Sequence, residues 1–546
     1  MNHLATADYV VFLIYFVIVV GYGYWIYNRR RKAEFNTTDF FLAEGSLTWW
    51  AIGASLIASN ISAEHFIGMA GSGFAMGLAI SSYEWFAAAT LIIVAVFFIP
   101  IYLRNHIYTM PQFLAQRYSD TVSTILAVFW LAVYVLVNLT SILYLGAIAI
   151  ESLVGISFTA CTIGLAVFAI FITLGGMKVI GYTDVVQVVV LVFGGLVVTY
   201  LALDLVSKET GTNAGVWNGL LSLRQKADGH FHMFFPKGHP QYDVLPGMAL
   251  VTGGMWLNNL YYWGCNQYIV QRALGADLKT ARSGILFAAF MKLMIPLIVV
   301  IPGIAAYVLY QNGTFQAAMT DASGVVKPDH AYPVLMNLLP VGMKGLAFAA
   351  LTAAIVASLA SKCNSISTIF TLDLYKKYVD KNASEQKLVK VGRWGIVVSF
   401  AIAIGLAPLL RSLDQVYQYI QEYTNFITPG IFAIFLLGFF WKRATNRAAL
   451  TVAILTLPLS TLLKFWPEMM SMVGSESDPI PFLHRTTWVF CIDVGIMVLV
   501  SLTDPASHEA NSDIIVDRRM FRVTPSFVAG SVGIFSILAV LYTMFW

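Results

Sequence analysis

The sequence is poor in charged residues and nearly devoid of cysteine. Only 11% of its 546 residues are charged, against roughly 25% in soluble domains, whereas 58% are hydrophobic. This balance excludes an ordinary soluble protein, and a net charge of +4 without a basic aromatic surface gives no indication of nucleic-acid binding. The four cysteines have no paired spacing, so neither a disulfide framework nor a zinc site is indicated.

Long apolar runs are abundant instead. Runs of about 20 residues, the length that crosses a bilayer, recur along the whole chain and predict an all-α polytopic membrane protein with about 14 transmembrane helices. The predicted spans are 8–28, 47–75, 78–103, 121–152, 157–175, 180–205, 246–268, 281–311, 343–376, 388–410, 415–440, 446–466, 485–503 and 524–544.

The basic residues predict how the chain crosses the membrane. A positive cluster, Arg29–Lys32, follows the first apolar run, and no small-residue cleavage site does, which indicates a retained helix rather than a signal peptide. With the N-terminus outside, the cytoplasmic loops receive more than twice as many Lys and Arg residues as the outer loops. We therefore expect a multi-pass protein of the cell membrane with both termini extracytoplasmic.

Two of the predicted spans are interrupted by polar residues. Span 47–75 contains "ASNISAEHF", and span 246–268 contains "GGMWLNNLYYWGCNQYI". The first pattern is typical of a discontinuous helix whose unwound turn exposes carbonyls, although a polar helix-packing face of small residues is the alternative. Because the interruptions fall in the second and seventh spans, five positions apart, they predict a 5+5 inverted repeat with a site between the repeats.

This architecture divides the chain into five parts. They are an extra N-terminal helix with a basic cytoplasmic loop (1–46), a first repeat (47–205), an extracellular loop (206–245), a second repeat (246–440) and three C-terminal helices (441–546).

Single charged residues lie inside two other predicted spans. Glu84 occurs in "SSYEWF" and Lys292 in "AAFMKLMIP", and each needs a partner in the membrane because an isolated charge there is costly. A structural ion pair is one interpretation. Charged donors and acceptors beside aromatic faces such as Tyr83, Tyr262 and Trp263 also suit a hydroxyl-rich solute, which favours a sugar or polyol.

The span 343–376 carries small residues and hydroxyls at helical spacing, in "AAIVASLASKCNSISTIFTLDLY". Most of its serines are explained by helix packing. An alkali cation, however, requires several oxygen ligands, and Ser358 beside the broken second span would supply one.

Taken together, several motifs resemble the sodium:solute symporter family, specifically its sodium/galactose (sodium/glucose) cotransporter branch. The motifs are "SLIASNISAEHFIG", "SYEW", "NLYYWG.NQYI", "PGIAAYV", "IFT.D.Y" and "QYIQEYT", in matching order and spacing. The resemblance implies a LeuT-type core, no cofactor, no enzymatic activity, and sodium as the ion that drives sugar import by alternating access.

The resemblance also implies a sodium site. Its ligands would be the carbonyls of Ala58, Ile61 and Ala354 and the hydroxyl of Ser358, and Ala357 stands where the family usually has a second hydroxyl. Asp184 corresponds to a carboxylate that assists sodium release, whereas a loop-capping acid is the structural interpretation of the same residue.

Substrate contacts are implied in the same way. The matching polar positions are Asn60, Glu84, Asn259, Lys292 and Gln421. Tyr262 matches the aromatic residue that closes the inner side, Met69, Tyr134 and Tyr417 match the outer lid, and Tyr83 and Trp263 are further gate residues. Two contacts depart from the branch, because His65 replaces a glutamine and Ala87 a serine. The sequence therefore does not choose between galactose, glucose and a related polyol.

The sequence is compatible with two other functions and disfavours a third. A sugar-gated sensor or channel would keep the pocket without tight coupling, as the missing hydroxyl at Ala357 allows. A proton-coupled transporter would use His65, because histidine is the side chain type that can change its charge near neutral pH. An intramembrane enzyme is disfavoured because no nucleophile with a base and no zinc motif lies at membrane depth.

Overall fold

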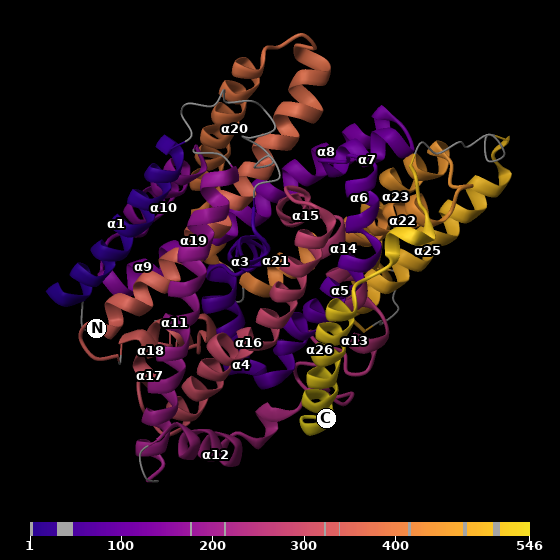
Figure 1. Ribbon diagram of the computed structural model, residues 1–546. Coiled ribbons are helices and arrows are strands. Elements are labelled where there is room, and N and C mark those ends of the chain that lie inside the picture. The colour runs from indigo at the N-terminus through magenta and orange to yellow at the C-terminus, as the bar shows by residue number, and fades with distance from the viewer. Residues whose placement is uncertain are drawn as a thin grey trace.

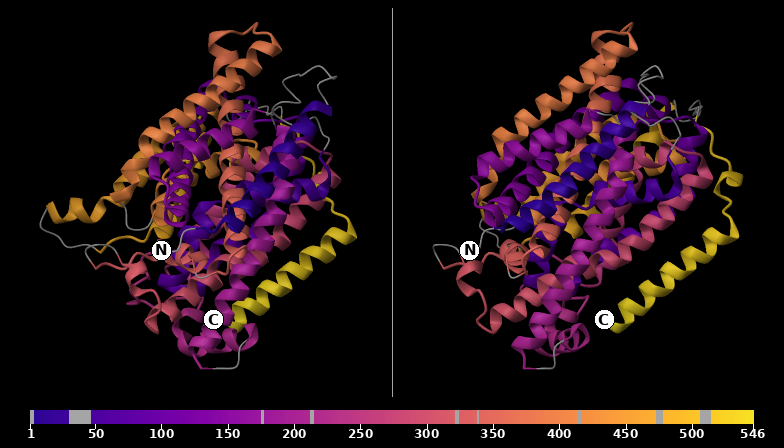
Figure 2. Two further views of the ribbon diagram at one scale, coloured as in Figure 1. Left: turned by 90° about the vertical axis from the view of Figure 1, so that its left-hand side faces the viewer. Right: turned by 60° about the vertical axis from the view of Figure 1, so that its left-hand side comes forward.

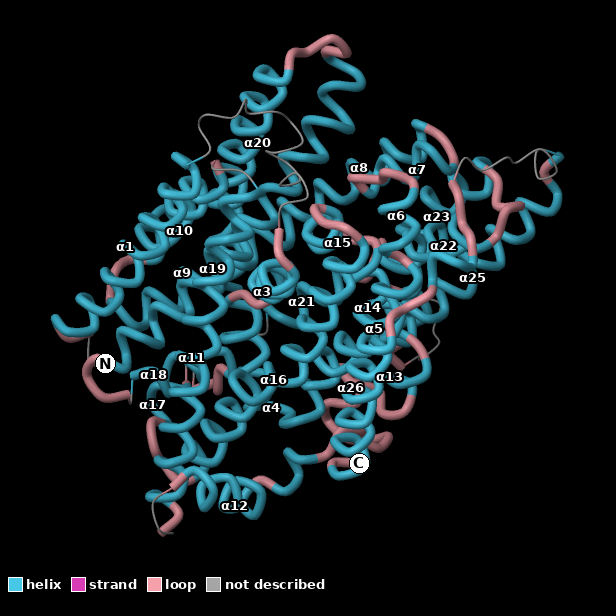
Figure 3. Tube along the Cα trace, in the orientation of Figure 1, coloured by secondary structure: helices cyan, strands magenta, loops and turns pink. Residues whose placement is uncertain are grey.

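The protein is built from helices. The computed structural model describes residues 4–29, 47–174, 177–211, 215–320, 324–337, 339–412, 416–472, 478–505 and 514–546. Within these ranges every regular element is helical, apart from one isolated bridge between Thr320 and Val326 (Figure 3). The all-α prediction is confirmed, and the predicted basic loop at 30–46 lies outside the described residues.

Ten helical stretches of the described chain are long and apolar enough to cross a membrane. They are α1 (Thr6–Arg29); Glu64–Arg104, made of η2 (Glu64–Met69), α4 (Ala70–Met76), η3 (Gly77–Ser81), α5 (Ser82–Phe97) and α6 (Ile99–Arg104); Asp120–Val154, made of α8 (Asp120–Ala132), η4 (Val133–Leu139) and α9 (Thr140–Val154); α11 (Met177–Glu209); α16 (Leu278–Gln311); Met343–Val379, made of α19 (Met343–Thr368) and η7 (Ile369–Val379); α20 (Glu385–Leu406) with η8 (Ala407–Ser412); α23 (Asn446–Lys464); α25 (Phe482–Thr503); and α26 (Pro525–Met544).

Further predicted spans are bent, short or divided. The pair α21 (Val416–Thr424) and α22 (Thr428–Phe440) is bent by 42° and makes an eleventh span if counted as one. Span 157–175 corresponds to α10 (Phe158–Thr173), which has 16 residues. Spans 47–75 and 246–268 are divided, the first between α3 (Trp49–Asn60) and η2, the second among α13 (Ala249–Thr252), α14 (Gly254–Gly264) and α15 (Gln267–Leu274). Ten or eleven spans are thus established by length, and fourteen stays a prediction.

The break after α3 has a local cause in its side chains. Ile61 takes an extended conformation, with φ −74° and ψ 123°, which ends the helix. The hydroxyl of Ser62 accepts from the N–H of Glu64 at 3.1 Å, and the N–H of Ser62 points to Nδ1 of His65 at 3.4 Å. These polar side chains stabilise a turn inside the protein, as non-helical backbone at membrane depth requires.

The centre of the bundle is formed by α16, which packs against α3, α4, α5 and α11 (Figure 1). Glycines allow close approach there. A Cβ atom at Gly73 would lie 2.9 Å from the carbonyl oxygen of Val300, and one at Gly53 would lie 2.7 Å from that of Gly284. Small residues at helix interfaces let backbones meet in membrane proteins, so this packing fixes the broken α3–α4 region on α16.

The first and last helices lie at the edges of the bundle. In α1, the Asp8 carboxylate accepts from the N–H groups of Gly342 and Gly345 at 2.7 and 2.8 Å, which ties α1 to the start of α19. Figure 2 shows α26, in yellow, along the outside of the bundle. Its apolar side chains, such as Val532 and Val540, are exposed, as expected for a helix in contact with lipid.

Candidate functional site

An internal cavity of about 70 Å³ lies between the broken helices. Its walls combine amides, charges and aromatic rings. The lining residues are Asn60, Glu64, His65, Tyr83, Glu84, Ala87, Asn138, Asn258, Asn259, Tyr262, Trp263, Asn266, Tyr268, Lys292, Lys362, Tyr417, Ile420, Gln421 and Thr424.

All seven predicted sugar contacts line this cavity, as do four of the six predicted gate residues. Met69 and Tyr134 are the exceptions. Met69 is buried at the end of η2, and the hydroxyl of Tyr134 donates to the side chain of Asn266, which itself lines the cavity. Neither side chain lines the cavity, and their role as gates stays a prediction.

The predicted charges meet in one cluster. The ammonium of Lys292 on α16 lies 2.6 Å from Oε2 of Glu84 on α5, and it also donates to Oδ1 of Asn60. On its other oxygen, Glu84 faces Nε2 of His65 at 3.3 Å. These side chains are all buried. Each charge thus has the partner that its burial demands, and three elements are joined around one carboxylate.

Aromatic rings complete the walls. The amide of Asn60 donates to the hydroxyl of Tyr262 on α14 at 2.8 Å, which links the two divided spans directly. The Lys292 ammonium lies 5.2 Å from the centre of the Trp263 ring. Tyr83 and Tyr417 pack edge to face with ring centres 5.9 Å apart. Such faces beside charged donors and acceptors suit the C–H faces and hydroxyls of a sugar ring.

A second buried charge pair in the cavity was missed by the sequence analysis. Lys362 of α19 lies 3.7 Å from Oε1 of Glu64 in η2, and its ammonium is 5.3 Å from the ring centre of Tyr268. The signal was present in the sequence, because Lys362 is a lysine inside an apolar span and follows Ser358 by one helical turn.

The break after α3 faces α19 through one serine. The Ser358 hydroxyl lies 2.9 Å from the carbonyl oxygen of Ser59, 3.2 Å from that of Ile61 and 3.5 Å from that of Ala58. Ala357 adds no side-chain oxygen, and Ala354, one turn earlier, is buried on the same helix. Carbonyls and a hydroxyl that converge in this way have the chemistry required to replace the hydration shell of an alkali cation.

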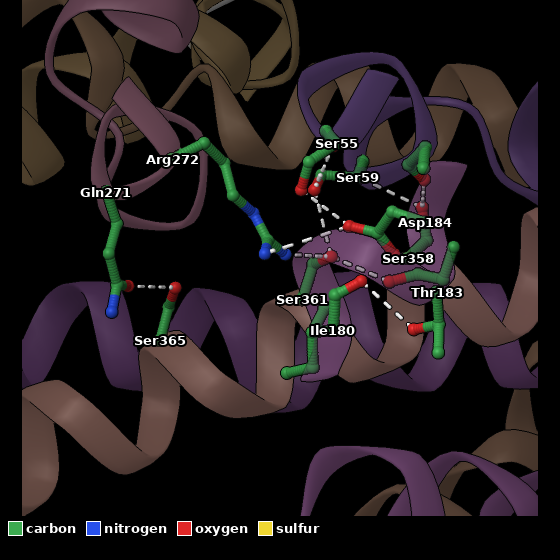
Figure 4. A network of polar contacts seen from close by, with 12 residues as sticks. Ser55, Ser59, Ile180, Thr183, Asp184, Gln271, Arg272, Ser358, Ser361 and Ser365 are labelled. Carbon is green, nitrogen blue, oxygen red and sulfur yellow. Dashed lines mark hydrogen bonds and ion pairs between the residues drawn. The ribbon is translucent and has the colours of Figure 1, made fainter. Parts of the chain in front are cut away.

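Asp184 of α11 belongs to a polar network beside Ser358, between α3, α11 and α19 (Figure 4). It accepts from the Ser55 hydroxyl at 2.6 Å and lies 3.7 Å from Nη1 of Arg272. Arg272 also donates to Ser361, whose hydroxyl is 2.9 Å from that of Ser59. Asp184 is 1% exposed. It is therefore an interior residue, connected through side chains to the break, and not a loop cap.

An apolar helical bundle with interrupted spans around a buried polar cavity defines a multi-pass membrane protein with an internal solute site. The chain belongs to the sodium:solute symporter family, whose family model matches residues 40–456. Proteins of this family are sodium-coupled transporters rather than enzymes, which confirms the sequence-based expectations for class and coupling ion.

Individual relatives agree with this membership. The chain is 45% identical over 550 residues to a sodium/glucose cotransporter of Vibrio parahaemolyticus, covering 100% of this chain and 99% of the relative. It is 33% identical over 542 residues to sodium/myo-inositol cotransporter 2 of Oryctolagus cuniculus, covering 94% and 79%. Among solved structures, a substrate-bound, outward-open sodium-coupled sialic acid symporter has the same fold, with a TM-score of 0.76, 20% identity, and coverage of 92% and 98%.

Proposed function

We propose that this chain is a sodium-coupled symporter that imports a hexose or related polyol. One observation carries the proposal. The break in the second span directs backbone carbonyls toward the hydroxyl of Ser358, and the same break presents the side chains of Asn60, Glu64 and His65 to the polar cavity. A relative with 45% identity over the whole chain is named a sodium/glucose cotransporter, which supports the same solute class.

In this proposal the solute lies in the cavity among Glu84, Lys292 and their neighbours. Glu84 and Lys292 provide a charged acceptor and donor for hydroxyls, and Asn259 and Gln421 provide amides. His65 and Ala87 adjust the solute preference, because one adds an imidazole beside Glu84 and the other leaves space on the same wall. Tyr262 closes the inner side of the site, Met69, Tyr134 and Tyr417 form the outer lid, and Tyr83 and Trp263 contribute further aromatic faces.

The sodium ion lies between α3 and α19. Its ligands are the carbonyls of Ala58, Ile61 and Ala354 and the hydroxyl of Ser358, with Ala357 leaving one ligand position to water. By joining the break to α19, sodium orders the turn that presents Asn60, Glu64 and His65 to the solute. After the bundle rocks, Asp184 receives the ion on its way to the cytoplasm.

The architecture that we propose is a LeuT-type 5+5 inverted repeat within fourteen spans, with repeats over 47–205 and 246–440. The hydrogen bond from Asn60 to Tyr262 supports it, because it joins the two divided spans that this arrangement brings together. The protein would lie in the plasma membrane with both termini outside, as the distribution of basic residues indicates.

The energetics of one coupling ion are sufficient. A sodium ion that moves down about 100 mV releases ~2.3 kcal/mol, and a tenfold gradient adds ~1.4 kcal/mol. Together they support roughly 500-fold accumulation of the solute.

The test is uptake of radiolabelled galactose, glucose and myo-inositol into proteoliposomes, with an inward sodium gradient or an equal potassium gradient at constant pH. We expect accumulation of at least one of these solutes with sodium only. Equal uptake in both gradients would contradict sodium coupling.

A proton-coupled transporter is the second candidate because His65 lies 3.3 Å from Glu84 inside the cavity. In that case a pH gradient without sodium would drive accumulation, and His65→Gln would abolish it. Under the proposal made here, His65→Gln changes the preference among sugars and leaves the sodium requirement in place.

A further inference from the structure

The second charge pair in the cavity is more open than the first. Lys362 and Glu64 both line the cavity, and their side chains are 4% and 10% exposed. The distance from Nζ to Oε1 is 3.7 Å, longer than the 2.7–3.2 Å of an N–H···O hydrogen bond. Among the residues that the structure describes, Oε1 of Glu64 has no hydrogen-bond partner. A buried carboxylate oxygen without a hydrogen bond is costly, so it is available for a ligand.

The first charge pair is closed by comparison. Lys292 lies 2.6 Å from Glu84, and Asn60 and His65 complete the polar contacts of the two side chains. Both ammonium groups lie over an aromatic ring, Lys292 at 5.2 Å from the centre of Trp263 and Lys362 at 5.3 Å from that of Tyr268, so the two pairs differ in their contacts to the carboxylates. Lys292 and Glu84 are therefore hydrogen-bonded to each other within the protein, whereas the Lys362 ammonium and Oε1 of Glu64 are too far apart to share a hydrogen bond.

The open pair joins α19 to η2, which begins shortly after the break that carries the proposed sodium ligands. Glu64 is the first residue of η2, directly after the break whose carbonyls meet Ser358. Lys362 follows Ser358 by four residues, which places both on one face of α19. Whatever fixes the distance between the break and α19 therefore also fixes the distance between Glu64 and Lys362.

We propose that Glu64 and Lys362 form a second hydroxyl-binding subsite, in which one substrate hydroxyl accepts from Nζ of Lys362 and donates to Oε1 of Glu64. This subsite rests on the proposed function, since it lies in the same cavity. It selects a neutral polyhydroxy solute, because a substrate carboxylate at Nζ would be repelled by Glu64. Sodium sets the spacing of the two side chains, so the ion raises the affinity for the hydroxyl that they share.

The experiment is competition by monodeoxy sugars against uptake of the best radiolabelled hexose in proteoliposomes. With the unaltered protein, we expect one deoxy position to weaken competition by roughly 10- to 100-fold, as for loss of a hydrogen bond to charged groups. In Lys362→Met, that analogue and its parent sugar should compete equally, while the ratios for other deoxy positions stay unchanged. Glucuronate should compete no better than the neutral hexose in either protein.

Two further variants separate a specific contact from a general disturbance. Glu64→Gln must reduce discrimination at the same deoxy position as Lys362→Met, and it also serves if Lys362→Met does not fold. Lys377→Met is the matched control, because Lys377 lies on η7, which continues the same helix, and pairs with exposed Asp120 outside the cavity. It should leave every ratio unchanged.

These experiments distinguish a failure of the Glu64–Lys362 subsite from a failure of the proposed sodium-driven uptake. Intact sodium-driven uptake with the same deoxy ratios in Lys362→Met, or an equal loss for all analogues, would overturn the subsite alone. Stronger competition by glucuronate than by the neutral hexose would also overturn it. Absence of sodium-driven uptake by the unaltered chain would overturn the proposed function and the subsite with it.

Discussion

Ser358 is the residue on which the proposed coupling depends most. Its hydroxyl is the one side-chain oxygen proposed as a sodium ligand, and it lies within 3.5 Å of three carbonyls of the broken helix. Replacing it with alanine should raise the sodium concentration for half-maximal uptake by about tenfold or more, because a cation loses one of few ligands. The measurement is sugar uptake against external sodium.

Ser141→Ala is the matched control for this variant. The Ser141 hydroxyl is also buried, but it bonds only to a carbonyl of its own helix, at 2.6 Å. It should leave the sodium dependence unchanged. Ala357→Ser adds a hydroxyl beside the proposed ion and should lower the sodium requirement, and an unaltered sodium dependence in both Ser358→Ala and Ala357→Ser would place the ion elsewhere.

Lys292 and Glu84 depend on each other for stability. Lys292→Met leaves the buried Glu84 with His65 as its remaining charged partner, and breaking such a pair typically costs about 3–5 kcal/mol. We expect a lower thermal midpoint in detergent for Lys292→Met, with partial recovery in the double variant that adds Glu84→Gln. Uptake should remain absent in both variants. Recovery of transport along with stability would show that the pair is structural and not a solute contact.

At the level of elements, the turn between α4 and η3 depends on Gly77. This residue has φ 72°, and a Cβ atom there would overlap the backbone of His230 in η5 (Asp228–Phe231). Gly77→Ala should therefore destabilise the protein by roughly 1–3 kcal/mol. The measurement is the thermal unfolding midpoint in detergent. Gly164→Ala is the control, since nothing lies within 4 Å of its Cβ position, and a similar loss in both variants would contradict the explanation.

The short helix η6 (Pro328–His330) carries a second packing feature of this kind, the enclosed carboxyl of Asp329. Asp329, outside the membrane-spanning helices, packs on α4, where a Cβ at Gly71 would lie 2.7 Å from its Oδ1. Its enclosure raises the pKa of the Asp329 carboxyl from 3.8 to about 7, although the N–H of Val416 and the charge of Lys327 oppose this shift. The folded protein therefore binds this proton more tightly than the unfolded chain does.

The sign of the pH effect follows from this raised pKa. The stability that protonated Asp329 contributes is complete below about pH 4 and is lost as the pH rises to about 7. Asp329→Asn should flatten the pH dependence of the thermal midpoint over that interval. Asp380 gives a control of opposite sign, because its hydrogen bond from Lys387 at 2.7 Å lowers its pKa. An unchanged pH profile in Asp329→Asn would contradict the assignment.

At the scale of the whole molecule, the sequence predicted the protein family from the order of its motifs and the all-helical membrane class from its composition. It also predicted that Asn60, Glu84 and Lys292 share one cavity, since buried charges require partners. Family membership and these contacts agree with that interpretation. The number of spans is harder to predict from the sequence, because hydropathy does not reveal that the predicted span 246–268 divides into three short helices.

Other features depended on tertiary packing. The hydroxyl of Tyr134, a predicted gate residue, bonds to Asn266, which lines the cavity, and side-chain type alone does not reveal such a contact. Lys362 lies among serines that helix packing explains, so the sequence alone does not single it out. Its contact with Glu64, which follows the break, shows that Lys362 faces the cavity. The Arg272 contact with Asp184 joins residues 88 positions apart in two elements that no local pattern relates.

The central claim is that sodium and sugar move together through one site, and reciprocal driving tests it most directly. Proteoliposomes would hold equal sodium inside and outside, with the best transported sugar added outside only, and radiolabelled sodium uptake would be measured at zero membrane potential. We predict that the sugar gradient drives net sodium entry, and that Ser358→Ala weakens this entry. Sugar entry without any movement of sodium would contradict coupled transport.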